Sequence, residues 1–330
     1  MIITRTPFRI SFAGGGSDLP AFYQRHEGCV ISATINKYMY IVIHPTFNQA
    51  GSVVKYSKTE IVNNNREIQH PIARQLLIDH KINGVEIVST ADVPSGTGLS
   101  TSSAYTVGLI HALYAYQGKF CSQERIAREA CELEIEKLGE PIGKQDQYGT
   151  AVGGLKFIRF MRDGFVEIEP LIIKKSVYRQ LEKNLLLFYT GLTHSAGTIL
   201  KEQGHNVLHE EEKYQNLIKM TDLAHNMRDA LVNGDMDAFG MILDENWKLK
   251  QQLAGSITNE VIEKYYETAK ESGALGGKLL GAGGGGFLLF YCTQEKQPRL
   301  RAALSDLVEL PFEFENGGTK VIYIGDKDWD

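Results

Sequence analysis

The segment 94–104 joins a strand pattern at 84–90 to a helix pattern at 102–116, and it reads Pro-Ser-Gly-Thr-Gly-Leu-Ser-Thr-Ser-Ser-Ala. Its two glycines permit backbone conformations in which several N–H groups point to one side. The helix start adds unpaired N–H groups and the positive end of the helix dipole. Four consecutive hydroxyl side chains add further donors. The segment therefore predicts a phosphate-binding loop. A serine-rich turn with an ordinary helix cap is the alternative that this segment alone leaves open.

Two other short segments are rich in glycine. Gly14, Gly15 and Gly16 follow a β-rich stretch at 2–13, and the segment 281–286 precedes an apolar strand pattern at 287–292. Residues 281–286 match G-x-G-x-x-G, but a strand follows them instead of a helix, which excludes a dinucleotide-binding fingerprint. Segments 14–16, 94–104 and 273–286 hold three, two and eight glycines, thirteen of the 33 in the chain. This concentration favours sites where backbone approaches a ligand, with plain tight turns as the alternative.

Charge and composition exclude several classes of protein. The 330-residue chain has 35 Lys and Arg against 40 Asp and Glu, a net charge of −5, and no long basic run. We therefore expect no nucleic-acid partner. The four cysteines are scattered and form no CxxC pair, which argues against a zinc site. No apolar run approaches the ~20 residues that span a bilayer, and the first residues lack a signal-peptide layout. We expect a cytoplasmic protein without membrane contact.

Strand and helix patterns along the chain predict an α+β protein. Strands are expected at 2–13, 29–35, 37–44, 53–56, 84–90, 155–160, 164–168, 185–190, 277–280, 287–292, 312–314 and 320–324. Helices are expected at 19–26, 71–80, 102–116, 122–137, 210–233, 236–252, 258–272 and 298–307. The pattern changes near residue 176, where long helices begin to dominate. We therefore expect two domains, 1–175 and 176–330.

Three segments in this order resemble the GHMP kinase superfamily, named for galactokinase, homoserine kinase, mevalonate kinase and phosphomevalonate kinase. They are the stretch 7–18 with its Pro-x-Arg and terminal Gly-Gly-Gly-Ser-Asp, the loop 94–104, and the glycine turn 281–286. The resemblance covers essentially the whole chain. It implies an N-terminal domain like ribosomal protein S5 domain 2 and a ferredoxin-like C-terminal domain. It also implies ATP and Mg²⁺ as cofactors, bound at an active site between the domains.

The resemblance assigns roles to individual residues. Those implied to bind ATP are Pro94, Gly96, Gly98, Leu99, Ser100, Thr101, Ser102 and Ser103. Asp146 resembles the catalytic base, and Arg9 resembles the arginine that pairs with it, with Arg5 as a rival for that role. Glu134 resembles the magnesium-binding glutamate, with Glu132 as the alternative, and Ser102 resembles the second magnesium contact.

The resemblance also implies a sugar site. Asp18 resembles the aspartate whose carboxylate accepts hydrogen bonds from two sugar hydroxyls. The residues implied to bind the substrate are Asp18, Gly15, Gly16, Tyr189, His194, Gly283 and Gly284. Segments 7–20 and 139–149 are similar to those of bacterial D-glycero-D-manno-heptose 7-phosphate kinases, which phosphorylate the anomeric hydroxyl to give a 1,7-bisphosphate on the route to surface polysaccharides. Candidates for holding the distal phosphate are Lys144, His194 and Lys278.

Two alternatives stay open at this point. The nearer one is a kinase of an unphosphorylated sugar of the L-fucose or galactose type. The other, from a different class, is a non-catalytic sugar sensor on the same fold. Under the leading hypothesis the partners are ATP and a small sugar phosphate, and the protein is a monomer or a homodimer.

Overall fold

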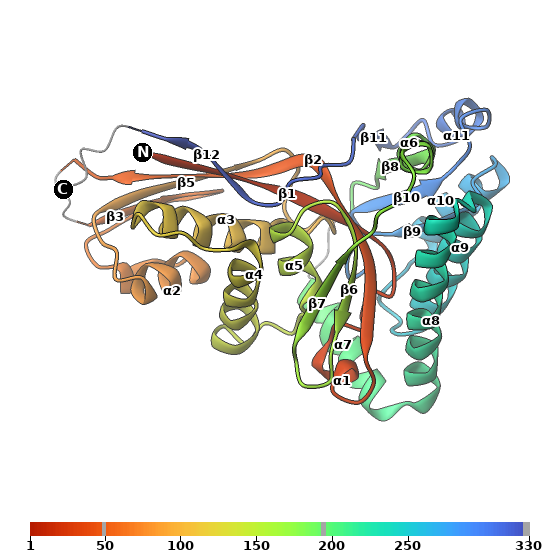
Figure 1. Cartoon of the computed structure of the whole chain (residues 1–330), viewed down its shortest axis with the longest axis horizontal. Coiled ribbons are helices and arrows are strands. Elements are labelled where there is room, and N and C mark those ends of the chain that lie inside the picture. Colours follow the sequence, from red (N-terminus) through yellow and green to blue (C-terminus); the bar gives the residue numbers. More distant parts are fainter. Residues whose placement is uncertain (48–50, 193–195, 326–330) are drawn as a thin grey trace.

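Two β-sheets organise the chain (Figure 1). The computed structural model describes residues 1–47, 51–192 and 196–325. Within these ranges the larger sheet contains β1 (Ile2–Ala13), β2 (Gly28–Pro45), β3 (Ser52–Lys55), β4 (Thr59–Val62), β5 (Val85–Ala91), β6 (Leu155–Phe160), β7 (Val166–Pro170) and β12 (Lys320–Ile324). The smaller sheet has the order β11 (Val308–Glu309), β8 (Leu185–Tyr189), β10 (Phe287–Tyr291) and β9 (Gly276–Leu279). The pairing of β3 with β5 is parallel, whereas the others in these two sheets are antiparallel.

Strand β1 is covered by both halves of the chain. α3 (Thr101–Tyr116) and α5 (Gln145–Ala151) contact it from the N-terminal half, and α8 (Glu211–Asn233) and α9 (Met236–Gln251) contact it from the C-terminal half. Its first residues alternate between buried and partly buried, but every position from Thr6 to Ala13 is buried. Because successive strand residues face opposite sides of a sheet, this pattern means that both faces of β1 are covered beyond Thr6. Arg9 lies in this doubly covered stretch.

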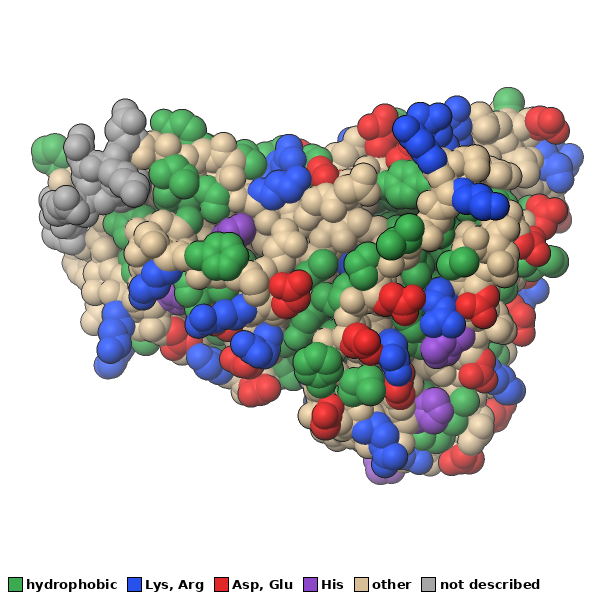
Figure 2. Space-filling view, viewed as in Figure 1, with side chains coloured by type: hydrophobic (Ala, Val, Ile, Leu, Met, Phe, Trp, Pro, Cys, Tyr) green, Lys and Arg blue, Asp and Glu red, His purple; other side chains and the backbone are tan. Residues whose placement is uncertain are grey.

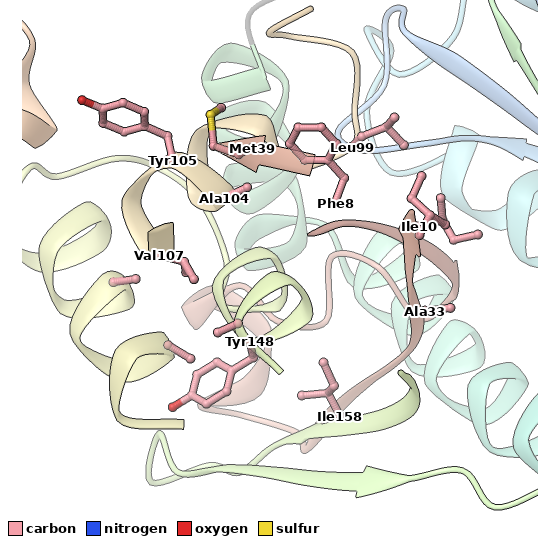
Figure 3. Close-up of a cluster of buried hydrophobic side chains, with 14 of the residues drawn as sticks. Phe8, Ile10, Ala33, Met39, Leu99, Ala104, Tyr105, Val107, Tyr148 and Ile158 are labelled. Atoms are coloured by element: carbon pink, nitrogen blue, oxygen red, sulfur yellow. The ribbon is translucent and has the colours of Figure 1, made fainter. Parts of the chain in front are cut away.

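A continuous apolar core fixes the loop 94–104 on the larger sheet. Figure 3 shows Phe8 and Ile10 of β1 near Leu99 of the loop, with Tyr148 of α5 in the same cluster. Phe8, Ile10 and Leu99 have no exposed surface. Burying a leucine side chain contributes roughly 1.5–3 kcal/mol, so Leu99 anchors the loop against the sheet.

The remaining helices are α1 (Pro20–Tyr23), α2 (Pro71–Asp79), α4 (Gln123–Cys131), α6 (Lys175–Asn184), α7 (Ala196–His209), α10 (Glu260–Glu271) and α11 (Gln297–Ala303), with a 3-10 turn η1 (Asn65–Glu67) and a π-helical turn η2 (Glu132–Lys137).

Four elements lack a clear sequence signal. The sequence patterns predicted none of α5, α6, α7 and β4. α7 contains Gly197 and Gly204, which are weak helix formers, and it is held by packing against α1 and α8.

Three other predicted elements differ in detail. The strands expected at 29–35 and 37–44 form one strand, β2, whose register shifts opposite Pro7 and Phe8. The strand expected at 312–314 is instead a single bridge between Ile35 and Phe314, and the paired residues nearby are those of β11. The helix expected at 122–137 starts as predicted, with the Ser122 side chain accepting from the Arg125 N–H, but it changes from α4 to the π-helical η2 at Glu132.

The second half of the chain returns to the first sheet at its end. The boundary expected after residue 175 falls at the start of α6, and β8, β9, β10 and β11 then form the smaller sheet. However, β12 pairs antiparallel with β1, for example Ile2 with Ile324 (Figure 1). None of the described helices is both long and apolar enough to cross a membrane. On the face drawn in Figure 2, basic side chains lie among acidic ones, in keeping with the small net charge.

Two glycine segments from opposite halves touch through their backbones. Gly98 has a φ of +82°, and a Cβ built on it would overlap the Leu280 carbonyl, lying 2.8 Å from its carbon. In the reverse direction, a Cβ on Gly281 would lie 2.6 Å from the Cα of Gly98. No side chain fits between these segments, so glycine is required for the loop 94–104 to meet the turn 281–286.

This contact predicts a difference between two glycine substitutions. Gly118→Ala also changes a glycine with positive φ, +66°, but nothing lies within 4 Å of its new Cβ. Gly118→Ala should cost about 1–2 kcal/mol from backbone strain alone. Gly98→Ala should cost about 1–3 kcal/mol more, because its Cβ meets backbone that cannot move aside cheaply. Unfolding free energies from urea denaturation would test this, and equal losses would contradict the close approach.

Candidate active site

A cavity of about 420 Å³ lies where the two halves meet. From the N-terminal half it is lined by β1, the 16–18 turn, the loop 94–104 (called the phosphate loop below, after its predicted role), η2 and the start of α5. From the C-terminal half it is lined by α7, α9 and the turn that follows β9. The lining includes twelve of the residues predicted for the site, namely Arg9, Gly16, Asp18, Gly96, Gly98, Ser100, Thr101, Ser102, Ser103, Glu134, Asp146 and Gly283.

The loop before α3 has the backbone of an anion site. Gly96 and Gly98 have φ of +73° and +82°, and Ser100, the residue before α3, is left-handed at φ 60° and ψ 38°. No side chain caps the N-terminus of α3, and the buried Ser100 Oγ has no hydrogen-bond partner among the described residues. Unpaired donors at a helix start fit phosphate oxygens. The strained residue lies at the position where these donors would be used.

Two residues predicted for this loop have structural contacts outside the cavity lining. The side chain of Leu99 is fully buried in the core beneath the loop. The Pro94 carbonyl accepts a hydrogen bond from the Thr97 hydroxyl at 2.9 Å, which closes the turn. Both residues shape the loop, and neither is among the residues that line the cavity.

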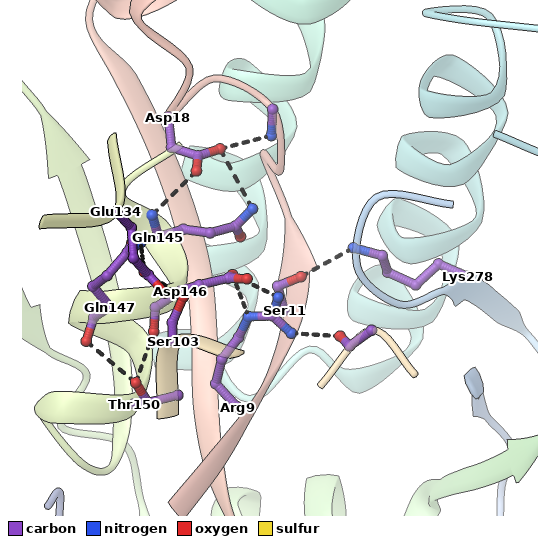
Figure 4. Close-up of polar contacts among 12 residues, drawn as sticks. Arg9, Ser11, Asp18, Ser103, Glu134, Gln145, Asp146, Gln147, Thr150 and Lys278 are labelled. Atoms are coloured by element: carbon purple, nitrogen blue, oxygen red, sulfur yellow. Dashed lines mark hydrogen bonds and ion pairs between the residues drawn. The ribbon is translucent and has the colours of Figure 1, made fainter. Parts of the chain in front are cut away.

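Arg9 binds Asp146 and the phosphate loop at the same time (Figure 4). Its Nε and Nη2 donate to Oδ1 of Asp146 at 2.9 and 2.6 Å, while Nη1 donates to the Gly98 carbonyl at 2.7 Å. The Arg9 side chain is 2% exposed and that of Asp146 is 31% exposed. Both contacts to Asp146 use Oδ1, which leaves Oδ2 without a hydrogen bond to the described residues. Arg5, the rival candidate, instead pairs with Glu315 at 3.6 Å and lies over the Tyr38 ring.

Glu134 is a buried carboxylate beside the phosphate loop. It is 1% exposed and accepts from the hydroxyls of Ser103 and Thr106 at 3.0 and 2.8 Å and from Nε2 of Gln147 at 2.5 Å. Burial raises its pKa to about 7, although the three donors oppose the shift. The π-helical turn η2 places Glu134 inside, whereas Glu132 is exposed and lies 4.0 Å from Arg128.

The residues around Glu134 fit a magnesium ion. Mg²⁺ prefers one or two carboxylates, hydroxyl and water oxygens, and the phosphates of its nucleotide. Glu134 and the exposed Ser102 both line the cavity next to the loop. The described residues contain no cluster of three or more His, Cys, Asp or Glu side chains able to hold a metal. Glu134 and Ser102 are therefore the described residues that could hold such an ion.

Asp18 is held by the start of α5. Its Oδ2 accepts from the Gln145 N–H at 3.1 Å, its Oδ1 accepts from the Gly16 N–H at 3.0 Å, and the Gln145 side chain is 3.4 Å from Oδ1. Asp18 is 2% exposed, and burial raises its pKa despite these hydrogen bonds. Because Asp18 caps α5 from 127 positions away, the chain around Gln145 carries no local capping signal. This explains why the sequence did not predict α5.

Buried lysines approach the site from the C-terminal half. Lys250 of α9 lines the cavity, and Lys278 of β9 lies behind it, 3.4 Å from the Ser11 hydroxyl. Both are about 5% exposed or less. Burial lowers the pKa of Lys250 to about 8, and burial with nearby Lys250 and Arg9 lowers that of Lys278 to about 7. Lys144 lies outside the cavity lining, where it donates to the Gly164 carbonyl at 2.6 Å.

The remaining predicted substrate residues lie around the cavity or beyond it. The Gly15 carbonyl accepts from Lys250 at 3.4 Å, and the Gly284 N–H donates to the Ile257 carbonyl at 2.8 Å. Tyr189 packs against Phe287, with ring centroids 5.2 Å apart, and is not among the lining residues. His194 falls outside the described residues.

Sequence reasoning missed several polar residues of this site, namely Thr106, Gln147, Gln203 and Lys250. Thr106 lies three and four positions after Ser103 and Ser102. Residues at this spacing share one face of a helix, so the sequence did carry a signal for Thr106. Lys250 is one of two lysines in α9, and its burial in the fold distinguishes it from the exposed Lys248.

Comparison with known proteins decides the family. Two family profiles match, GHMP kinases N terminal domain at residues 66–154 and GHMP kinases C terminal at residues 227–310. The D-glycero-alpha-D-manno-heptose 7-phosphate kinase of Campylobacter jejuni is 30% identical over 315 residues, which cover 92% of this chain and 93% of that protein. This chain belongs to the GHMP kinase family.

Other GHMP kinases extend the comparison. The bifunctional fucokinase/GDP-fucose pyrophosphorylase of Arabidopsis thaliana is 30% identical over 342 residues, which cover 94% of this chain and 32% of that protein. A D-glycero-D-manno-heptose 1-phosphate kinase from Bacteroides thetaiotaomicron superposes with a TM-score of 0.82 at 24% identity, over 99% of this chain and 100% of that one. At this identity the likeness shows the fold alone. It confirms the predicted two-domain α+β GHMP kinase fold.

The burial of Glu134 predicts how stability depends on pH without divalent ions. Its folded-state pKa is raised from 4.5 to about 7, so its contribution to stability is present below pH 4.5 and is lost as pH rises through about 7. Gln at position 134 stays neutral at every pH. As the pH rises from 4.5 to 8, the free energy of unfolding of Glu134→Gln should therefore increase by roughly 3 kcal/mol relative to that of the wild type.

Urea unfolding in EDTA at several pH values would measure this difference. Glu132→Gln removes an exposed acid from the same turn and should follow the wild-type profile. Parallel profiles for Glu134→Gln and the wild type would show that Glu134 is not the buried acid described here.

Proposed function

We propose that this GHMP kinase is an ATP-dependent sugar kinase that phosphorylates the C1 hydroxyl of D-glycero-D-manno-heptose 7-phosphate, giving the 1,7-bisphosphate. The observation that carries the proposal is the Arg9–Asp146 pair, which lies between the phosphate loop and Asp18 in one cavity. A base between an anion site and a hydroxyl-binding carboxylate is the arrangement that phosphoryl transfer to an alcohol requires. It also argues against a non-catalytic sensor.

ATP would occupy the cavity from the α2 side to the phosphate loop. Pro71, Ile72 and Leu138 line one part of the cavity and offer apolar surface for the base. The N–H groups of the loop 96–101 and the start of α3 would bind the phosphates. Glu134 and Ser102 would hold Mg²⁺, which when bound neutralises charge on the phosphates.

Asp146 would act as the general base. One carboxylate oxygen accepts the proton of the sugar C1 hydroxyl while the C1 oxygen bonds to the γ-phosphorus and the bond from that phosphorus to the ADP oxygen breaks. Arg9 fixes the orientation of Asp146 and places a positive charge beside the transferred group. In kinases of this kind most of the rate comes from such positioning and charge stabilisation.

The sugar would bind next to Asp18 and the glycines before it. The buried Asp18 carboxylate can accept further hydrogen bonds from ring hydroxyls, since each carboxylate oxygen has two acceptor sites. Heptose 7-phosphate is proposed as the substrate because the Campylobacter jejuni protein with that name matches nearly the full chain at 30% identity. A role in making activated heptose for surface polysaccharides, in the cytoplasm, follows from that substrate.

The substrate proposal predicts an order of preference among sugars. With Mg²⁺ and ATP, ADP release should be faster with D-glycero-D-manno-heptose 7-phosphate than with L-fucose or galactose, and ³¹P NMR should show a new anomeric phosphate. Turnover of the free sugars alone would favour a kinase of the fucose or galactose type. No ADP with any of them would favour a sugar sensor.

The proposed base predicts the effect of one substitution. Asp146→Asn keeps an oxygen to accept from Arg9 but cannot take up a proton at neutral pH. We expect kcat to fall by about 10²–10⁴-fold, with ATP binding by calorimetry nearly unchanged. A kcat close to that of the wild type would remove Asp146 from the proposed role.

A further inference from the structure

Two buried groups from the C-terminal half meet Gly16 at the edge of the cavity. Lys250 of α9 is 5% exposed, and Gln203 of α7 is fully buried. A Cβ built on Gly16 would overlap Nε2 of Gln203 and would lie 3.3 Å from Nζ of Lys250. Because both Gly16 and Lys250 line the cavity, this is a point where side chains of one half reach the ligand-facing backbone of the other.

Both of these groups present hydrogen-bond donors. Nζ of Lys250 donates to Oε1 of Gln203 at 2.6 Å and is 3.4 Å from the Gly15 carbonyl. An ammonium has no acceptor, so the amide oxygen must face Lys250 and the amide NH₂ must face Gly16. Nε2 of Gln203 has no hydrogen-bond partner among the described residues. A fully buried donor without a partner is costly. Gln203 itself is not among the residues that line the cavity, but its amide lies beside Gly16 and holds Lys250, and both of those residues line it.

The ammonium of Lys250 also lacks a direct ion pair among the described residues. That of Lys278 forms none within the same ranges, and it lies close enough for the two charges to repel. Asp18 is near enough to favour the charged form of Lys250, but it forms no ion pair with it. Buried charges are normally paired, so this corner of the cavity favours an anion.

We propose that Lys250, oriented by Gln203, binds the distal phosphate of the sugar substrate and thereby sets the preference for a phosphorylated sugar. This rests on the proposed function, because it places the sugar ring between Asp146 and Asp18. Asp18 and Lys250 both lie beside Gly16, where Asp18 can accept from sugar hydroxyls and Lys250 can donate to phosphate oxygens in a charge-assisted arrangement. Lys278 adds positive charge from behind.

The test compares heptose 7-phosphate with the same heptose lacking the phosphate. Lys250→Met should lower kcat/KM for heptose 7-phosphate by on the order of 10- to 100-fold, mainly through KM, and should change that for the free heptose little. Gln203→Leu should shift the ratio of the two kcat/KM values in the same direction, and Lys250→Arg should restore part of it.

Lys156→Met is the matched control, because Lys156 is equally buried but contacts the Gly154 carbonyl at 3.1 Å and does not line the cavity. Its ratio should equal that of the wild type.

The outcomes separate this proposal from the kinase assignment. If Lys250→Met lowers kcat/KM equally for both sugars, or for neither, the phosphate site is overturned. The proposed wild-type reaction is not affected by that outcome. If the wild type does not turn over heptose 7-phosphate, calorimetry decides. Tighter binding of heptose 7-phosphate to the wild type than to Lys250→Met would support the site without the reaction. Equal affinity, or no binding to either protein, would overturn it.

Discussion

The buried guanidinium of Arg9 is the interaction on which the cavity depends. It lies on β1, a strand that both halves of the chain cover, and it joins Asp146 of α5 to the Gly98 carbonyl of the loop 94–104. The planar, rigid fork of an arginine holds both partners in a fixed relation that a lysine could not reproduce. A buried guanidinium left without any acceptor at position 146 would be strongly destabilising, so folding and the placement of the base are coupled through this side chain.

Much of the charge in the cavity is balanced by neutral groups and not by opposite charges. Glu134 and Asp18 are held by hydroxyl, amide and backbone N–H donors, and Lys250 and Lys278 have no carboxylate partner among the described residues. Raised pKa values for the acids and lowered ones for the lysines follow from this burial. These buried acids and lysines keep their orientation before a ligand binds. A charged ligand then binds to groups that are already oriented, so little reorganisation is needed.

The sequence was most informative where local pattern and ligand-binding backbone coincide. The loop 94–104, the helix after it and the apolar strands followed from glycine spacing and hydrophobic periodicity. The family resemblance suggested Arg9 over Arg5 and Glu134 over Glu132. In the fold Arg9 contacts Asp146 whereas Arg5 pairs with Glu315, and Glu134 is buried whereas Glu132 is exposed. What could not be predicted depends on contacts between distant residues. α5 begins where Asp18 caps it, α7 is held by its neighbours despite two glycines, and Lys250 is distinguished from other helix lysines only by its burial.

The pairing of β12 with β1 has a consequence for how the protein is made. Ile2 leaves the ribosome 322 residues (324 − 2) before its partner Ile324. At about 5–20 residues per second this delay is on the order of 16–65 s. During that interval one side of β1 has unpaired backbone groups, the kind of open strand edge that invites association between nascent chains. Chaperone binding at β1 would protect the chain over this period.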